Sequence, residues 1–163
     1  MKAQIWSLDL IISVVIFTTM IALFFFTFNT LSADAEEHNS LSKMQDISLE
    51  VTEALIRTSG LPSDWNNETV QVIGFAVNEN VLDGDKVLYF VNTTIDYNRS
   101  KVLMGIGNYE YYFQIDHPNG TVVELSGLNL IKGVDYATAK TIVRVERFVV
   151  LSGLKKLKFT LWR

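Results

Sequence analysis

Acidic and histidine side chains lie close together in the sequence at two places where a metal ion has to be considered. The first is the run Asp34, Glu36, Glu37 and His38. Neighbouring residues of a helix point in different directions, so these side chains cannot all converge on one ion, and we interpret them as a solvated helix face. The second, Asp83-Gly84-Asp85, lacks the loop spacing and terminal glutamate of an EF-hand, and we interpret it as a turn. We therefore predict no metal site.

Residue types that carry out catalysis are not arranged for it in this sequence. There is no cysteine, which excludes a thiol nucleophile, a thiolate metal site and a disulfide framework. We expect His117 to have a surface or packing role at the end of a strand, and Gly105-Ile106-Gly107 to form a turn. No Ser-His-Asp set, phosphate-binding loop or dinucleotide fingerprint is present. The sequence therefore predicts neither an enzyme nor a cofactor site.

Positive charge is concentrated near the end of the sequence, although the whole chain has a net charge of -4. Such a cluster is a solvated sheet face, a surface complementary to another subunit, or a contact with DNA. No aromatic stacking platform accompanies the cations, so we expect no nucleic acid partner. Glu146 is the one acid in this last stretch, whose cations are Lys140, Arg144, Arg147, Lys155, Lys156, Lys158 and Arg163.

Asp9 stands at the entrance of a long apolar segment, Leu10 to Phe28, that contains no charged residue. A carboxylate among apolar helices is costly unless a cation pairs with it, and acids inside a membrane are functional by default. Because Asp9 begins the segment rather than lying in its middle, it can also be a solvated carboxylate at the level of the lipid headgroups. The residues alone leave both interpretations open.

The element that carries Asp9 is predicted to be a membrane-spanning helix over residues 5–29. Leu10 to Phe28 is roughly nineteen residues, which at about 1.5 Å each reach close to 30 Å, the hydrocarbon thickness of a bilayer. This apolar run is longer than that of a secretory signal, and Lys2 alone makes a thin positive region before it, so we expect a retained anchor. Its polar side chains are hydroxyls that can bond back to the preceding turn, namely Ser13, Thr18, Thr19 and Thr27.

The charges that flank the span predict its orientation. Lys2 precedes it and acidic residues follow, so the positive-inside tendency places the N-terminus in the cytoplasm and the rest of the chain outside. We expect a single-pass membrane protein with an extracytoplasmic head. Four Asn-X-Ser/Thr sequons lie on the outer side and are either chance matches or candidate N-glycosylation sites. They begin at Asn67, Asn92, Asn98 and Asn119.

The helix is predicted to continue beyond the membrane as an amphipathic segment over residues 30–59. Between Leu41 and Leu55 apolar residues recur at spacings of three and four, and no proline or glycine interrupts them. Ser59-Gly60-Leu61-Pro62 ends the helix, because glycine can take the left-handed position and proline cannot continue it. One helix is therefore predicted from about Ile5 to Thr58.

Residues 60–163 predict a small β-rich head with two short helices. The helices are expected at Lys86–Asn92 and Asp96–Met104, with Asp96 as an N-cap and Gly105 and Gly107 closing the second. Pro118-Asn119-Gly120 is a hairpin signal. The predicted strands are Val70–Val77, Tyr109–His117, Thr121–Leu125, Thr141–Leu151 and a last one through Leu157 to the end.

Alternation of apolar and polar residues predicts which face of the sheet is buried. In Tyr109–His117, Tyr111, Phe113 and Ile115 share one face and Asp116 lies on the other. The strands would form an antiparallel sheet of four or five strands with one apolar face, and the striped half of the long helix is the available cover. The expected fold class is α+β.

The layout of the chain resembles that of archaeal type IV pilins. A short polar leader, Met1-Lys2-Ala3, precedes Gln4 and an apolar helix, an acid lies a few positions into that helix (Asp9, after Ser7), and the helix passes into a small β-rich head. Three further segments are similar to archaeal pilin-like membrane proteins. They are Ser59–Trp65, Leu103–Tyr109 and Phe159–Arg163.

The resemblance implies a class III leader, residues 1–4, that a prepilin peptidase removes. A cut after Ala3 makes Gln4 the first mature residue and Asp9 the sixth. A cut after Gln4 makes Asp9 the fifth and Ser7 the third, but it leaves a bulky residue before the cut. Both positions stay open.

The resemblance also implies a major, minor or priming subunit of a cell-surface filament, held in the bilayer before assembly. Asp9 would pair with the new α-amino group of a neighbouring copy. The implied partners are other pilin-like subunits, the prepilin peptidase, an assembly ATPase and its platform protein. The alternative is a non-polymerising envelope protein whose head binds the surface layer or a secretion or archaellum-type machine.

Overall fold

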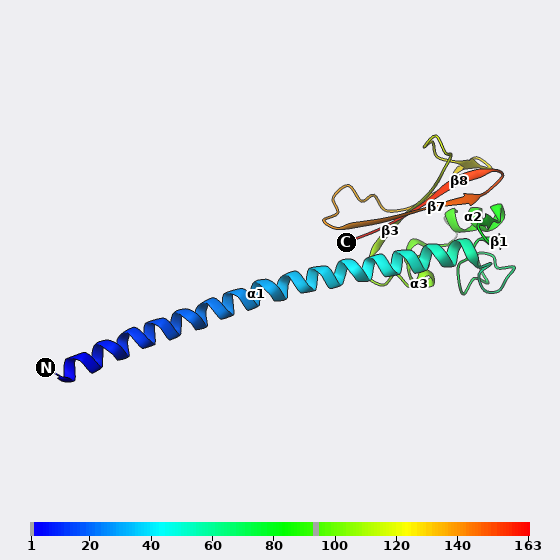
Figure 1. Cartoon of the computed structure of the whole chain (residues 1–163). Coiled ribbons are helices and arrows are strands. Elements are labelled where there is room, and N and C mark those ends of the chain that lie inside the picture. Colours follow the sequence, from blue (N-terminus) through cyan, green and yellow to red (C-terminus); the bar gives the residue numbers. More distant parts are fainter. Residues whose placement is uncertain (1, 93–94) are drawn as a thin grey trace. The chain divides into compact units, whose positions relative to one another are not determined.

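The computed structural model describes residues 2–92 and 95–163, and within its first helix it describes the side chains from residue 8 to 32 and from 38 onward. The chain divides into two compact units, Met1–Ser40 and Leu41–Arg163, which we describe separately. One long helix contributes to both units, and every strand belongs to the second, the head (Figure 1). The architecture is α+β, as the sequence predicts.

Helix α1 (Lys2–Arg57) agrees with the helix predicted from Ile5 to Thr58. The first unit contains no other described element, and the side chains from Leu8 to Ser32 are therefore exposed on every side of the helix. In the head unit its buried residues recur at helical spacing and include two hydroxyls, Ser48 and Thr52, that donate to backbone carbonyls of the preceding turn. The buried set is Met44, Ser48, Val51, Thr52, Leu55 and Ile56.

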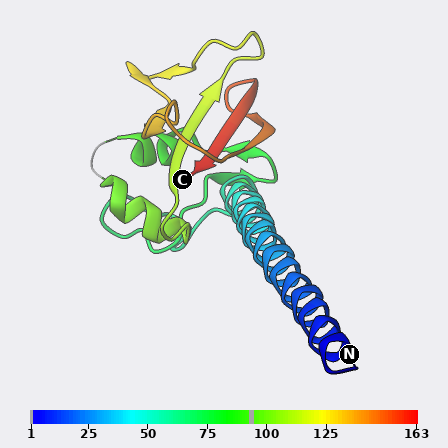
Figure 2. The same cartoon turned by 90° about the vertical axis from the view of Figure 1, so that its left-hand side faces the viewer.

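The central strands of the head are β7 (Ile142–Val150) and β8 (Leu154–Trp162), which form a long antiparallel hairpin, and β3 (Glu110–Asp116) pairs with the other edge of β8. Figure 2 shows β3 and β8 running side by side in the head. All three lie within or close to the predicted strands. The turn of the hairpin is Ser152-Gly153, where both residues have positive φ.

The sheet is larger than predicted, and it is not wholly antiparallel. It has six strands in the order β1-β2-β7-β8-β3-β6, where β1 is Ala76–Asn78, β2 is Val81–Leu82 and β6 is Ile131–Gly133. Strand β2 runs parallel to β7, with Val81 beside Val150. The prediction of four or five antiparallel strands was therefore wrong in number and in this pairing, because these short strands have too few residues to show an alternating pattern.

The predicted strand Val70–Val77 was wrong over most of its length, since only its end belongs to β1. The segment instead crosses the C-terminal end of α1 and supplies its capping donors. Phe75 N–H donates to the Leu55 carbonyl and Ala76 N–H to the Thr58 carbonyl, both at 2.9 Å. These carbonyls have no partner within the helix, so the segment satisfies them in place of a strand ladder.

Two side chains also bind the chain at the end of α1. The indole N–H of Trp65, a residue that is almost wholly buried, donates to the carbonyls of Ser59 (3.0 Å) and Gly74 (2.9 Å). The Lys86 ammonium donates to the same Ser59 carbonyl at 2.8 Å and to the Ser63 carbonyl at 2.6 Å. The helix end is thereby held by both main-chain and side-chain donors.

The predicted return strand Thr121–Leu125 is present only in part. The turn before it is present, with His117 N–H donating to the Thr121 carbonyl at 2.8 Å, but the return segment pairs with β3 only through a bridge at Val122. Glu124–Leu125 (β4) then pairs with Leu128–Asn129 (β5) in a separate two-stranded sheet, and β6 takes the position beside β3.

The two short helices lie close to their predicted positions. Helix α2 (Gly84–Val91) begins at Asp83, whose carboxylate accepts from the N–H groups of Asp85 and Lys86, so Asp83-Gly84-Asp85 is a helix start rather than a free turn. Helix α3 (Tyr97–Met104) has Asp96 as its N-cap and Gly105 in the left-handed conformation at its end, as predicted.

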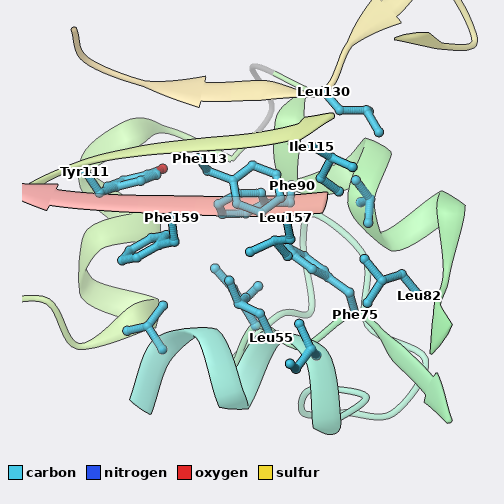
Figure 3. Close-up of a cluster of buried hydrophobic side chains, with 14 of the residues drawn as sticks. Leu55, Phe75, Leu82, Phe90, Tyr111, Phe113, Ile115, Leu130, Leu157 and Phe159 are labelled. Atoms are coloured by element: carbon cyan, nitrogen blue, oxygen red, sulfur yellow. The ribbon is translucent and has the colours of Figure 1, made fainter. Parts of the chain in front are cut away.

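The core lies between the covered face of the sheet and the helices, and aromatic rings fill much of it (Figure 3). Phe113 of β3 lies edge-on to Phe90 of α2, with ring centroids 5.1 Å apart, and to Phe75, at 5.8 Å. Tyr111 stacks on Phe159 at 5.9 Å. The predicted inward face of β3, Tyr111, Phe113 and Ile115, is wholly buried.

Candidate membrane segment and polar clusters of the head

The apolar part of α1 is long and apolar enough to cross a membrane over Leu8–Ser32. None of it is buried within the chain. The threonine hydroxyls are satisfied internally, since Thr18 donates to the Val14 carbonyl and Thr19 to the Val15 carbonyl, each at 2.7 Å. These hydroxyls therefore need no partner outside the helix, which suits a hydrocarbon environment.

Asp9 is the second residue of this segment, and its side chain is exposed. Among the side chains that the structure describes, none makes a hydrogen bond or an ion pair with it. Ala3, Gln4 and Ser7, the other residues predicted to act in processing and assembly, lie outside the described side chains.

In the run of acidic residues and a histidine before the head, the structure describes the side chain of His38, which is exposed. Asp34, Glu36 and Glu37 lie outside the described side chains. Within the part of the chain that is described, no group of three or more acidic or histidine side chains is arranged to hold a metal ion.

The basic residues near the end of the chain are more strongly paired than the sequence predicts. Arg147 reaches Glu53 of α1 at 3.3 Å, and Lys156 reaches Glu146 at the same distance. Lys155 Nζ lies 3.3 Å from His117 Nδ1. Glu146 is the one acid in the last stretch of the sequence, but sheet pairing and helix packing bring further acids from distant segments to these cations.

Arg144 stacks rather than pairs with an acid. Its guanidinium lies 5.2 Å from the centre of the Tyr136 ring and donates to the Tyr136 hydroxyl at 2.6 Å. Its Nε donates to the Thr160 hydroxyl at 3.3 Å, and Tyr136 lies edge-on to Tyr112. No aromatic partner was predicted for these cations, and the loop between β6 and β7, which contains Tyr136, supplies one.

Asp116 is the polar residue that sequence reasoning placed wrongly. Alternation puts it on the outer face of β3, yet its side chain is wholly buried. The Lys158 ammonium lies 2.6 Å from Asp116 Oδ2, an ion pair that is not aligned as a hydrogen bond, and Gln114 donates to the other oxygen. Lys158 faces Asp116 diagonally across the sheet, because their strands pair in register at Gln114 and Lys158.

A second polar cluster joins α3 to β3. The Tyr97 hydroxyl donates to Glu110 Oε2 at 2.6 Å and Lys101 donates to Glu110 Oε1 at 2.8 Å, while Tyr111 N–H donates to the Tyr97 oxygen. Burial would raise the pKa of Glu110, but the hydrogen bonds from Lys101 and Tyr97 outweigh it and lower the pKa. Burial raises the pKa of Tyr97. The polar groups of this cluster thus form hydrogen bonds with one another, and we interpret their role as structural.

Lys132 of β6 is half-buried and lacks an acidic partner among the ion pairs of the described residues. Its ammonium donates to the Ile95 carbonyl at 2.7 Å and lies 5.2 Å from the centre of the Phe90 ring. Burial lowers the pKa of Lys132 to about 8, although the charge of Asp96 opposes the shift. Lys132 thus fastens β6 to the chain that precedes α3.

The four sequons lie in different local structures of the head. Asn67 is in the loop after Trp65, Asn92 follows the last residue of α2, Asn98 is inside α3, and Asn119 is at the tip of the turn after β3. The hydroxyl residue of the Asn92 sequon, Thr94, lies outside the described residues.

Comparison of the chain with protein-family models, with curated proteins and with solved structures finds no match.

Proposed function

We propose that this chain is a type IV pilin-like subunit, anchored in a membrane before it assembles into a cell-surface filament. The observation that carries the proposal is α1 itself. One helix presents an exposed surface without a charged residue from Leu10 to Phe28, and its later turns supply core residues to a folded head. A subunit of this design can leave lipid without unfolding, because its head does not depend on the exposed part of the helix.

The exposed apolar surface is too large to remain in water. Sixteen large apolar side chains between Leu8 and Leu31 are exposed. At about 1.5–3 kcal/mol for each side chain fully buried, their transfer from water to an apolar environment is worth on the order of 20–50 kcal/mol. The helix therefore needs lipid, or the same surface of other copies, around it. Lipid surrounds the helix before assembly, and a bundle of the same helices would surround it afterwards.

Asp9 is the residue that distinguishes a filament subunit from a simple anchor in this proposal. An unpaired carboxylate inside a helix bundle would be strongly destabilising, whereas a nearby ammonium would offset that cost. Cleavage by a prepilin peptidase after Ala3 or Gln4 would create such an ammonium on a neighbouring copy. The absence of a counter-ion for Asp9 among the described side chains is consistent with a partner from another chain.

The proposal further assigns the N-terminus to the cytoplasm and the head to the outside. The partners are the bilayer, other pilin-like subunits, the peptidase, and an assembly ATPase with its platform protein. The role is structural, without enzymatic activity.

The test is to locate the protein and to map its N-terminus. Mass spectrometry of sheared surface filaments should recover the chain, and its first peptide should begin at Gln4 or Ile5. An intact Met1 together with absence from the filaments would contradict the proposal and would favour the alternative, a non-polymerising anchored protein whose head binds the surface layer or a larger machine.

A further inference from the structure

We infer that, of the three sequons that the structure describes in full, Asn119 is the one that the folded head presents for N-glycosylation, and that the folded state withholds Asn98 and Asn67. A glycan is attached to the amide nitrogen of the asparagine, and recognition also requires the hydroxyl of the residue two positions later. Both groups must therefore be accessible at one time. The structure of the head separates the sequons by this criterion.

Asn119 satisfies the criterion at the tip of the turn that follows β3. Asn119 and Thr121 are both exposed, and Asn119 Oδ1 accepts from the Thr121 N–H (3.1 Å) and the Thr121 hydroxyl (2.8 Å). The two side chains that an enzyme must recognise are thus already held together. The amide nitrogen of Asn119 makes no hydrogen bond to any other described residue.

The space around this turn is open. A Cβ atom placed on Gly120, between the two sequon residues, would meet no atom within 4 Å. The turn is held from below by backbone hydrogen bonds, with Gly120 N–H donating to the His117 carbonyl at 2.9 Å. An enzyme can therefore approach the tip without opening the sheet.

Asn98 fails the criterion because of its hydroxyl residue. The asparagine is exposed, but it lies in the first turn of α3, and Ser100 is wholly buried. The Ser100 hydroxyl donates to the Tyr97 carbonyl at 2.6 Å and lies 2.6 Å from the hydroxyl of Tyr111 in the core. Recognition of this sequon requires α3 to unfold.

Asn67 fails through its own side chain. The residue is half-buried, and its Oδ1 is enclosed without a hydrogen-bond partner, so the carboxamide is turned into the protein. Its main-chain carbonyl accepts from Arg99, and the hydroxyl of Thr69 is engaged by Asn66 rather than by Asn67. The pairing of carboxamide and hydroxyl seen at Asn119 is absent here.

The co-substrate is a sugar carried on a lipid phosphate. The bond formed joins Asn119 Nδ2 to the anomeric carbon of the sugar, and the bond broken joins that carbon to the phosphate oxygen. The lipid phosphate leaves with the electron pair, and a proton leaves Nδ2 for a base of the transferase. No oxidation or reduction takes place.

The inference can be tested in vitro, independently of filament formation. The full chain in detergent micelles is incubated with a purified oligosaccharyltransferase and a lipid-linked oligosaccharide, once folded and once in urea at the highest concentration that the enzyme tolerates. Glycopeptide mass spectrometry should find at least tenfold more glycan on Asn119 than on Asn98 or Asn67 in the folded chain. In urea the difference should shrink several-fold.

Matched variants make the assignment specific. Asn119→Gln and Thr121→Ala should each abolish modification at residue 119 of the folded chain, whereas Asn98→Gln should leave that modification unchanged. No glycan on Asn119 of the folded chain, or equal amounts on Asn98, overturns the inference. Neither result would bear on the filament proposal, whose test is the recovery of the chain from surface structures.

Discussion

Replacing Leu55 by alanine tests whether α1 is an integral part of the head. Leu55 is 1% exposed and points from α1 toward Leu157 and Phe75 (Figure 3). Leu49, on the same helix, is 42% exposed and provides a matched control, since both substitutions change the helix propensity by the same amount. The difference between the two variants therefore isolates the contribution of packing.

The magnitude follows from the burial of the two side chains. A wholly buried leucine loses its transfer free energy and leaves a cavity, so Leu55→Ala should lower the free energy of unfolding of the head by about 3–4 kcal/mol. Leu49→Ala should cost less than about 1 kcal/mol. With an m-value of about 2 kcal/mol/M in urea, the unfolding midpoint should fall by roughly 1.5–2 M for Leu55→Ala and by less than about 0.5 M for the control.

The assay is urea unfolding of the full chain in detergent, followed by tryptophan fluorescence, to which the buried Trp65 contributes. Equal midpoints for the two variants would refute the packing of α1 on the sheet. An unchanged m-value is required for the comparison, because a changed m-value would mean that a different amount of surface is exposed on unfolding.

Further substitutions address the anchor and the polar groups of the head. Asp9→Ala should block filament assembly while membrane insertion stays intact, as measured by shearing and by carbonate extraction; normal filaments would rule out the pairing role. Lys158→Met leaves the buried Asp116 carboxylate without its cation and should lower the free energy of unfolding by about 3 kcal/mol. The double variant Lys158→Met/Asp116→Asn should recover at least half of this loss. No recovery in urea titrations would argue against the ion pair. Since the pKa of Lys132 is lowered from 10.5 to about 8, the unfolded chain binds more protons between these values, and stability should rise with pH across this window. In urea titrations at several pH values, Lys132→Met should remove most of this increase in the free energy of unfolding, and the exposed control Lys140→Met should not. An increase that persists in Lys132→Met would come from another titratable group.

The features that the sequence predicts well are those that depend on local periodicity. The stripe of α1 predicts its buried face, and alternation predicts the buried side of β3, because each pattern repeats over several turns or residue pairs. Asp96 and Gly105 were correctly predicted to bound α3, since a cap depends on neighbouring backbone groups alone.

The features that the sequence does not predict depend on contacts between distant segments. The apolar run Val70–Val77 has the composition of a strand, but its donors are used by the end of α1. The partner of Asp116 is a lysine some forty residues later, and only the register of β3 and β8 brings the two together. The sequence pattern likewise does not show that the Ser100 side chain is buried beside Tyr111 while that of Thr121 stays exposed.

The capping of α1 by main-chain donors has a mechanical consequence. Asn80 N–H donates to the Ile56 carbonyl, and Val150 N–H of β7 donates in turn to the Asn80 carbonyl. A tensile load applied along the helix would thus pass through peptide groups into the middle of the sheet and then spread over neighbouring strands. Since peptide groups are common to all residues except proline, which lacks the donor, this load path should tolerate wide variation in side chains.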